Sequence, residues 1–150
     1  MSAQSISSAL LAAAPEVMET MFFSEALVSE APAENEAPVV RAIVAFSGEP
    51  HGNLSAEVDE PAARRLAADF VGAMEPDELS PKQVEEVVGE LANMLCGAML
   101  TALHTDRIFE LATPVVSHAT PTKHRTAVAD SYFDLGDGGL RIAVDVGAQS

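Results

Sequence analysis

Hydrophobic residues recur at the spacing of an α-helix in three stretches of the chain. These predicted helices cover residues 4–23, 61–73 and 81 to about 104. Pro15 lies inside the first and should kink it or begin a second helical piece, because proline has no backbone N–H to donate. Ser80 and Gln83 have the spacing of a capping box, which favours a helix start at Pro81.

Strands are predicted where apolar residues alternate with polar ones or form short runs. These stretches are residues 26–29, 39–46, 54–58, 111–118, 126–135 and 140–146. Pro114 should make the fourth an irregular or edge strand. Turn residues at 47–52 and 136–139 predict two hairpins. The order of elements indicates one α+β domain over residues 1–150, with helices packed on a mostly antiparallel β-sheet.

The acidic composition narrows the class of partner. The net charge is -15, from 8 basic and 23 acidic residues. Such a field repels nucleic acid and anionic membranes and favours a partner with a positive patch. The simpler interpretation is that the acidic residues only keep the protein soluble.

Cellular location is predicted from what the chain contains. The apolar run near the N-terminus is short and has no basic segment before it, which does not fit a secretory signal. No apolar run reaches the length of a membrane span. Cys96 is the only cysteine, so no internal disulfide forms, and its apolar setting predicts packing rather than reactivity. We therefore expect a cytoplasmic protein.

The helix predicted from Pro81 has two distinct faces. An apolar face should pack on the sheet. It contains Val84, Val87, Val88, Leu91, Leu95, Ala98 and Ala102. A second line, with spacings of three and four, contains Gln83, Glu86, Glu90, Asn93, Gly97, Thr101 and His104.

Asn93 and Gly97 are unusual choices for an exposed helix face. Asparagine is a poor helix former, and glycine costs about 1 kcal/mol relative to alanine. Gly97 would let the backbone of a partner approach closely. The alternative is an ordinary solvated face, since a glutamate three residues before an asparagine occurs easily by chance.

The segment from Val87 to Gly97 resembles the signature helix of CheX-like chemotaxis phosphatases, within the CheC, CheX and FliY group. That family has a Glu-x-x-Asn pair followed by glycine at the position of Gly97. Residues 44–48 and Gly52 resemble its first hairpin, and Ala-Arg-Arg-Leu-Ala at 63–67 resembles its next helix. Residues 113–116 resemble its Leu-Pro-x-Val stretch. The similarity covers roughly residues 10–146.

The resemblance implies a phosphatase of two-component signalling. It would accelerate dephosphorylation of a CheY-like response-regulator receiver domain. Asn93 would orient the attacking water and Glu90 would pair with the receiver's lysine. The same line would contact the partner through Gln83, Glu86, Gly97 and Thr101. No cofactor or metal of the chain's own is implied, because the receiver supplies Mg²⁺.

Two further features of the resemblance concern the type of protein. CheC-type proteins carry two Glu-x-x-Asn helices and this chain has one, which favours the CheX type. CheX-type members dimerise, which implies a homodimer. Glu86 is a departure, because many relatives have Asp or Ser at that position.

Two other functions are compatible with the same sequence. A non-catalytic adaptor or scaffold of the same fold would bind a receiver without turnover, and a purely structural domain would bind none. His51, His104, His118 and His124 fit no zinc-binding spacing. The sequence therefore predicts no metal site.

Overall fold

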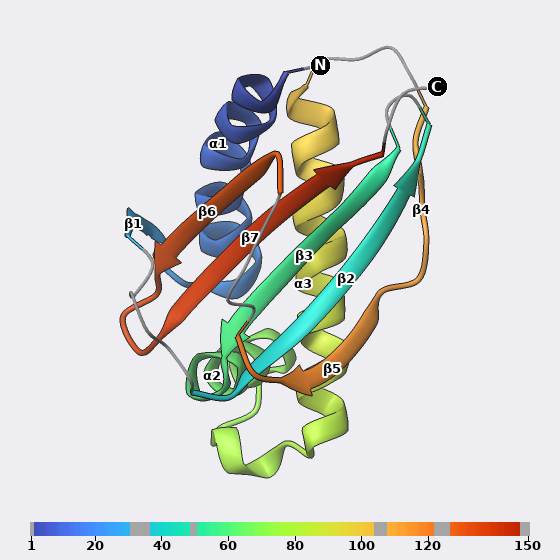
Figure 1. Ribbon diagram of the computed structural model, residues 1–150. Coiled ribbons are helices and arrows are strands. Elements are labelled where there is room, and N and C mark those ends of the chain that lie inside the picture. The colour runs from blue at the N-terminus through green and yellow to red at the C-terminus, as the bar shows by residue number, and fades with distance from the viewer. Residues whose placement is uncertain (1, 31–36, 49–50, 104–107, 122–126, 148–150) are drawn as a thin grey trace.

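The structure is a computed structural model, and it describes residues 2–30, 37–48, 51–103, 108–121 and 127–147 (Figure 1). Its helices are α1 (Ala3–Phe22), α2 (Glu60–Val71), the short 3-10 helix η1 (Pro76–Glu78) and α3 (Pro81–Ala102). Its strands are β1 (Leu27–Ser29), β2 (Val39–Ser47), β3 (Gly52–Asp59), β4 (Glu110–Leu111), β5 (Val115–Ala119), β6 (Ala129–Asp134) and β7 (Gly139–Val146).

The seven strands form one sheet in the order β1-β6-β7-β3-β2-β4, and β5 also pairs with β2. Every pairing is antiparallel. The two predicted hairpins are the pairs β2–β3 and β6–β7 at the centre of the sheet. The α+β fold predicted from the sequence is confirmed.

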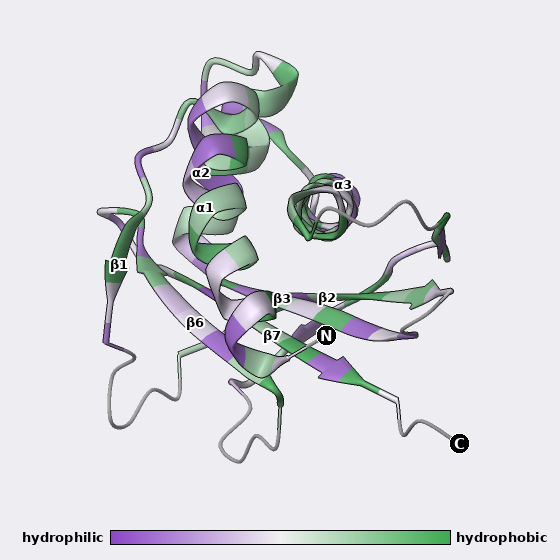
Figure 2. Cartoon of the chain, turned by 90° about the horizontal axis from the view of Figure 1, so that it is seen from above, coloured by the Kyte–Doolittle hydropathy of each residue, from purple (hydrophilic) through white to green (hydrophobic). Residues whose placement is uncertain are grey.

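All three α-helices cover the same face of the sheet (Figure 2). The hydrophobic core lies between the two layers. Alternate residues of β2 and β3 face it, because successive strand side chains point to opposite faces. These residues are Val40, Ala42, Val44, Phe46, Leu54, Ala56 and Val58, all at most 3% exposed. None of the helices formed by the described residues is long and apolar enough to cross a membrane.

Pro15 does not divide the first helix, which runs unbroken from Ala3 to Phe22. A second helical piece, one of the two predicted outcomes, is therefore wrong. An internal proline costs about 3 kcal/mol, but this helix buries eight side chains, which offsets that cost. The residue whose carbonyl loses its donor is Leu11, on the exposed side of the helix.

The start of α3 follows the predicted capping box. The Gln83 backbone N–H donates to the Ser80 side-chain oxygen over 3.2 Å, and the Ser80 N–H donates to Gln83 Oε1 over 2.8 Å. These two bonds satisfy amide groups that have no partner inside the helix. The helix ends at Ala102, so His104, at the predicted end, lies outside the described residues.

Two predicted strands differ from the observed ones. The stretch 111–118 is divided into β4 and β5, and Pro114 lies between them. Both pieces pair with β2, as expected for an interrupted strand at the sheet edge. The strand predicted from Thr126 begins at Ala129, and Thr126 itself is not among the described residues.

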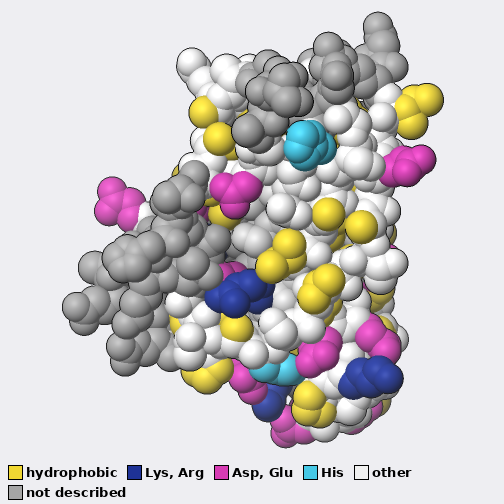
Figure 3. All heavy atoms as spheres, turned by 45° about the vertical axis from the view of Figure 1, so that its right-hand side comes forward, with side chains coloured by type: hydrophobic (Ala, Val, Ile, Leu, Met, Phe, Trp, Pro, Cys, Tyr) yellow, Lys and Arg dark blue, Asp and Glu magenta, His cyan; other side chains and the backbone are white. Residues whose placement is uncertain are grey.

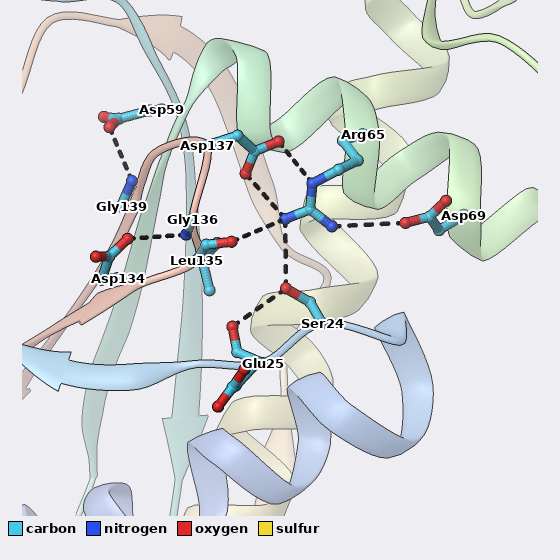
Figure 4. A network of polar contacts seen from close by, with 10 residues as sticks. All are labelled: Ser24, Glu25, Asp59, Arg65, Asp69, Asp134, Leu135, Gly136, Asp137 and Gly139. Carbon is cyan, nitrogen blue, oxygen red and sulfur yellow. Dashed lines mark hydrogen bonds and ion pairs between the residues drawn. The ribbon is translucent and has the colours of Figure 1, made fainter.

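The β6–β7 turn is fastened to α2 by a guanidinium group (Figure 4). Arg65 Nε and Nη2 donate to the two Asp137 carboxylate oxygens over 2.6 and 2.9 Å. Arg65 Nη2 also donates over 3.3 Å to Oγ of Ser24, a residue that follows the end of α1. The hydrogen bond to Asp137 raises the Arg65 pKa against the effect of burial. One side chain therefore connects three elements distant in sequence.

Candidate functional site

The rotation of α3 about its axis is set by its buried face. Five predicted core residues are at most 6% exposed: Val84, Val87, Val88, Leu91 and Leu95. Ala98 and Ala102 are only half-buried. The buried arc is wider than predicted and adds Gly89, Ala92, Cys96, Met99 and Leu100. The arc is wider because α3 packs against α1, against α2 and against the sheet.

Glu90 and Asn93 both lie outside this buried arc. Glu90 is exposed and Asn93 is half-buried, while Leu91 and Ala92 between them are buried. Residues three apart on a helix are neighbours on its surface. A carboxylate and an amide are thus presented together on an accessible face of α3.

The rest of the predicted line lies on the same side of the helix. Gln83, Glu86 and Thr101 are exposed, and Gly97 is half-buried. An added Cβ at Gly97 would meet nothing within 4 Å. No neighbour within the described part of the fold therefore requires a glycine there. The open position one turn after Asn93 leaves room for another molecule.

A groove of about 430 Å³ lies beside Glu90, between α3 and the segment 113–116. The α3 side is lined by Lys82, Glu85, Glu86, Gly89 and Glu90. The opposite side is lined by Thr113, Pro114 and Val116. Figure 3 turns the β4–β5 side forward, with charged side chains gathered at its lower end below a group of hydrophobic ones.

Gly89 has a structural role that the sequence analysis missed. A Cβ at this position would come within 3.1 Å of Val116 Cγ2. A glycine in mid-helix was the available signal, because it is costly unless something approaches closely. Here the close approach is by the chain's own segment 113–116, which forms the opposite wall of the groove.

The glutamates beside the groove differ in their partners. Glu85 Oε2 lies 3.1 Å from His118 Nε2 on β5. Between described residues, no hydrogen bond or ion pair involves the side chain of Glu86 or Glu90. These two carboxylates are one turn apart. They are available to a cation on another molecule.

The other candidate residues that the structure describes form no second site. Cys96 is fully buried, and burial raises its thiol pKa to about 12, so the predicted packing role is confirmed. His104 and His124 lie outside the described residues. Across the ranges that the structure describes, no group of three His, Cys, Asp or Glu side chains could hold a metal ion.

Comparison with solved structures shows the same fold in several chemotaxis proteins. A CheX from Vibrio vulnificus has a TM-score of 0.75 at 23% identity, over 95% of this chain and 96% of the other. A CheX from Desulfovibrio desulfuricans has a TM-score of 0.72 at 21% identity, over 95% and 99%. A complex of CheX with CheY, BeF₃ and Mg²⁺ from Borrelia burgdorferi has a TM-score of 0.66 at 17% identity, over 94% and 97%.

Sequence comparison is more specific. No curated protein matches the chain. The family model described as "Chemotaxis phosphatase CheX" matches residues 40–133, which is more than half of the 150 residues and runs from within β2 through α3 into β6. The chain therefore belongs to the CheX family of chemotaxis phosphatases.

Proposed function

We propose that this protein accelerates hydrolysis of the acyl phosphate on a receiver domain, with Asn93 and Glu90 of α3 as the working pair. Water attacks the phosphorus, and the bond between the phosphorus and the aspartate oxygen breaks. Inorganic phosphate is released, and the aspartate returns to its free carboxylate form. One observation carries the proposal: an amide and a carboxylate lie one turn apart on an accessible helix face, followed by the open position of Gly97.

Asn93 has the chemistry needed to position the water. Phosphoryl transfer depends on alignment and charge balance more than on covalent catalysis. A side-chain amide donates and accepts hydrogen bonds, so it can hold a water molecule in line with the phosphorus. A carboxylate at this position would be repelled by the phosphoryl oxygens.

Glu90 has the charge needed to fix the docking register. Its carboxylate is exposed and lies one turn before Asn93. There it would pair with the lysine that a receiver carries beside its phosphorylated aspartate. Gln83, Glu86 and Thr101 are exposed on the same side and would extend the contact surface.

The receiver would supply the metal ion. The solved Borrelia burgdorferi relative is a CheX in complex with CheY, BeF₃ and Mg²⁺. This supports a CheY-like receiver as the partner of the present chain. It is also consistent with Mg²⁺ acting from the receiver's side. We further propose that the protein works as a homodimer in the cytoplasm. The mass of the purified protein measured by sedimentation tests the proposed dimer.

Decay of a phosphorylated receiver tests the proposal. Receivers encoded in the same genome are phosphorylated with labelled acetyl phosphate, and loss of label is followed with and without this protein. We expect at least one receiver to lose its phosphate faster. A non-catalytic adaptor would bind a receiver and leave its decay unchanged, and that result would refute the catalytic assignment.

A further inference from the structure

We propose that the groove between α3 and residues 113–116 holds a long basic side chain of the receiver and thereby selects which receiver docks. The proposal rests on the receiver-binding function above. It concerns a second basic side chain, distinct from the lysine expected at Glu90. It also gives Glu86, placed above on the contact surface, a specific role at the rim of the groove.

The floor of the groove is apolar. Pro114 and Val116 face α3 across Gly89, and a Cβ at Gly89 would lie 3.1 Å from Val116 and 3.5 Å from Pro114. Glycine thus lets the two walls approach each other at the base of the groove. The remaining volume of about 430 Å³ admits a slender aliphatic chain.

The rim of the groove is acidic. Glu85, Glu86 and Glu90 line it together with one basic residue, Lys82. His118 already contacts Glu85, whereas Glu86 and Glu90 have no ion-pair partner within the described ranges. An incoming cation would therefore meet the Glu86 carboxylate without prior rearrangement, while Glu90 at the end of the groove stays available to the receiver's lysine.

Apolar floor and acidic rim together fit lysine or arginine. Their methylene stems pack on apolar surface while the charged head stays at the polar edge. An acidic side chain would be repelled by the rim. A purely apolar one would bury the carboxylates without satisfying them, which costs free energy. The protein's charge of -15 favours the same basic partner surface over a longer range.

The groove also has a defined position relative to the proposed chemistry. Glu90 belongs both to the groove and to the proposed catalytic pair, so the two surfaces are continuous. The groove extends from Glu90 toward Lys82, away from Asn93. Its occupant would therefore lie roughly 5 to 10 Å, or one to two helical turns, from the groups that face the phosphoryl site.

Binding and turnover measured separately test the groove. Binding to a beryllofluoride-loaded receiver and decay of the phosphorylated form are measured for the parent, Glu86→Lys and Thr113→Trp. The first variant reverses charge at the rim, and the second narrows the groove from its exposed wall. Asp145→Lys is the matched control, because Asp145 is exposed on the opposite face of the sheet and undergoes the same change of charge.

We expect both groove variants to bind at least tenfold more weakly, with decay at saturation within twofold of the parent. A receiver in which one exposed lysine or arginine is changed to glutamate should restore binding to Glu86→Lys. Unchanged binding of both groove variants would overturn the groove proposal while leaving the phosphatase function standing. A parent that binds receivers but does not accelerate decay would instead overturn only the catalytic assignment.

Discussion

Gly89 of α3 lies directly against Val116 of β5, such that a Cβ on Gly89 would come within 3.1 Å of Val116 Cγ2. Few real Cβ contacts are so short, so the Val116 side chain would have to give by a few tenths of an ångström. The same helix contains Gly97, where an added Cβ would meet no other described residue of the fold within 4 Å. The two glycines of this helix are therefore explained differently: Gly89 by a close contact within the chain, and Gly97 by the space it leaves open. Alanine substitutions at the two positions should have different effects.

Gly89→Ala should be destabilising or neutral in the parent and stabilising once Val116 is shortened. Alanine gains about 1 kcal/mol of helix propensity over glycine, but here the clash with Val116 opposes that gain. Val116→Ala removes the Cγ2 atom and with it the clash. Urea denaturation of the two single variants and the double variant measures the coupling, which we expect to be at least about 1 kcal/mol. Additive effects would contradict the packing argument.

Gly97→Ala should stabilise the fold and impair function. Because no atom of the described part of the chain would obstruct the new methyl group, the substitution should raise the free energy of unfolding by about 1 kcal/mol. The added methyl group would project where we place the receiver backbone, so receiver binding should weaken severalfold. Urea denaturation and binding to a beryllofluoride-loaded receiver measure the two effects. Improved stability with unchanged binding would show that Gly97 does not face the partner.

Local signals in the sequence predicted the elements that position the site. Ser80 and Gln83 define the start of α3, and the apolar spacing defines which side of it is buried. The position of Glu90 and Asn93 on an outward face followed from these two facts. Contacts between residues distant in sequence could not be predicted in this way, because a local sequence pattern does not indicate which other segment will pack against it.

Gly89 and Glu57 show the limit most clearly. The contact between Gly89 and Val116 joins residues 27 positions apart in the chain, and it forms only because β5 lies beside α3. Glu57 alternates along β3 with the buried Ala56 and Val58, a pattern that by itself places it on the open face of a half-buried strand. It is 3% exposed, and Arg41 Nε lies 2.6 Å from its carboxylate. Burial of a charge is tolerable only with such a partner, which the pairing of β2 with β3 supplies.

Arg65→Lys should lower the free energy of unfolding by about 1 kcal/mol. The planar guanidinium binds both oxygens of Asp137, and a lysine ammonium cannot reproduce that geometry. Arg64→Lys is the matched control, since Arg64 makes a single contact to Glu60 at an exposed helix surface. That variant should change stability by less than about 0.5 kcal/mol. Equal effects of the two substitutions in urea denaturation would refute a special role for Arg65.

Alkaline pH should destabilise the protein partly through Cys96. Burial raises the pKa of this thiol from 9.0 to about 12. Above pH 9 the unfolded chain loses the thiol proton while the folded protein retains it. Stability therefore falls as pH rises from 9 toward 12, with a slope of up to about 1.4 kcal/mol per pH unit from this group. Cys96→Ala should show a flatter alkaline profile in urea denaturation, and an identical slope would contradict the assignment.

Asn93→Ala should reduce the acceleration of receiver dephosphorylation by roughly a hundredfold, which corresponds to about 2.7 kcal/mol of barrier. The fold should stay intact, because Asn93 is only half-buried and alanine is the better helix former. Binding to a beryllofluoride-loaded receiver should change little, since the amide acts on the water rather than on docking. Asn53→Ala is the matched control, because Asn53 is exposed on the opposite face of the sheet. If Asn93→Ala removes phosphate as fast as the parent while Asn53→Ala does the same, the attacking water is positioned by another group.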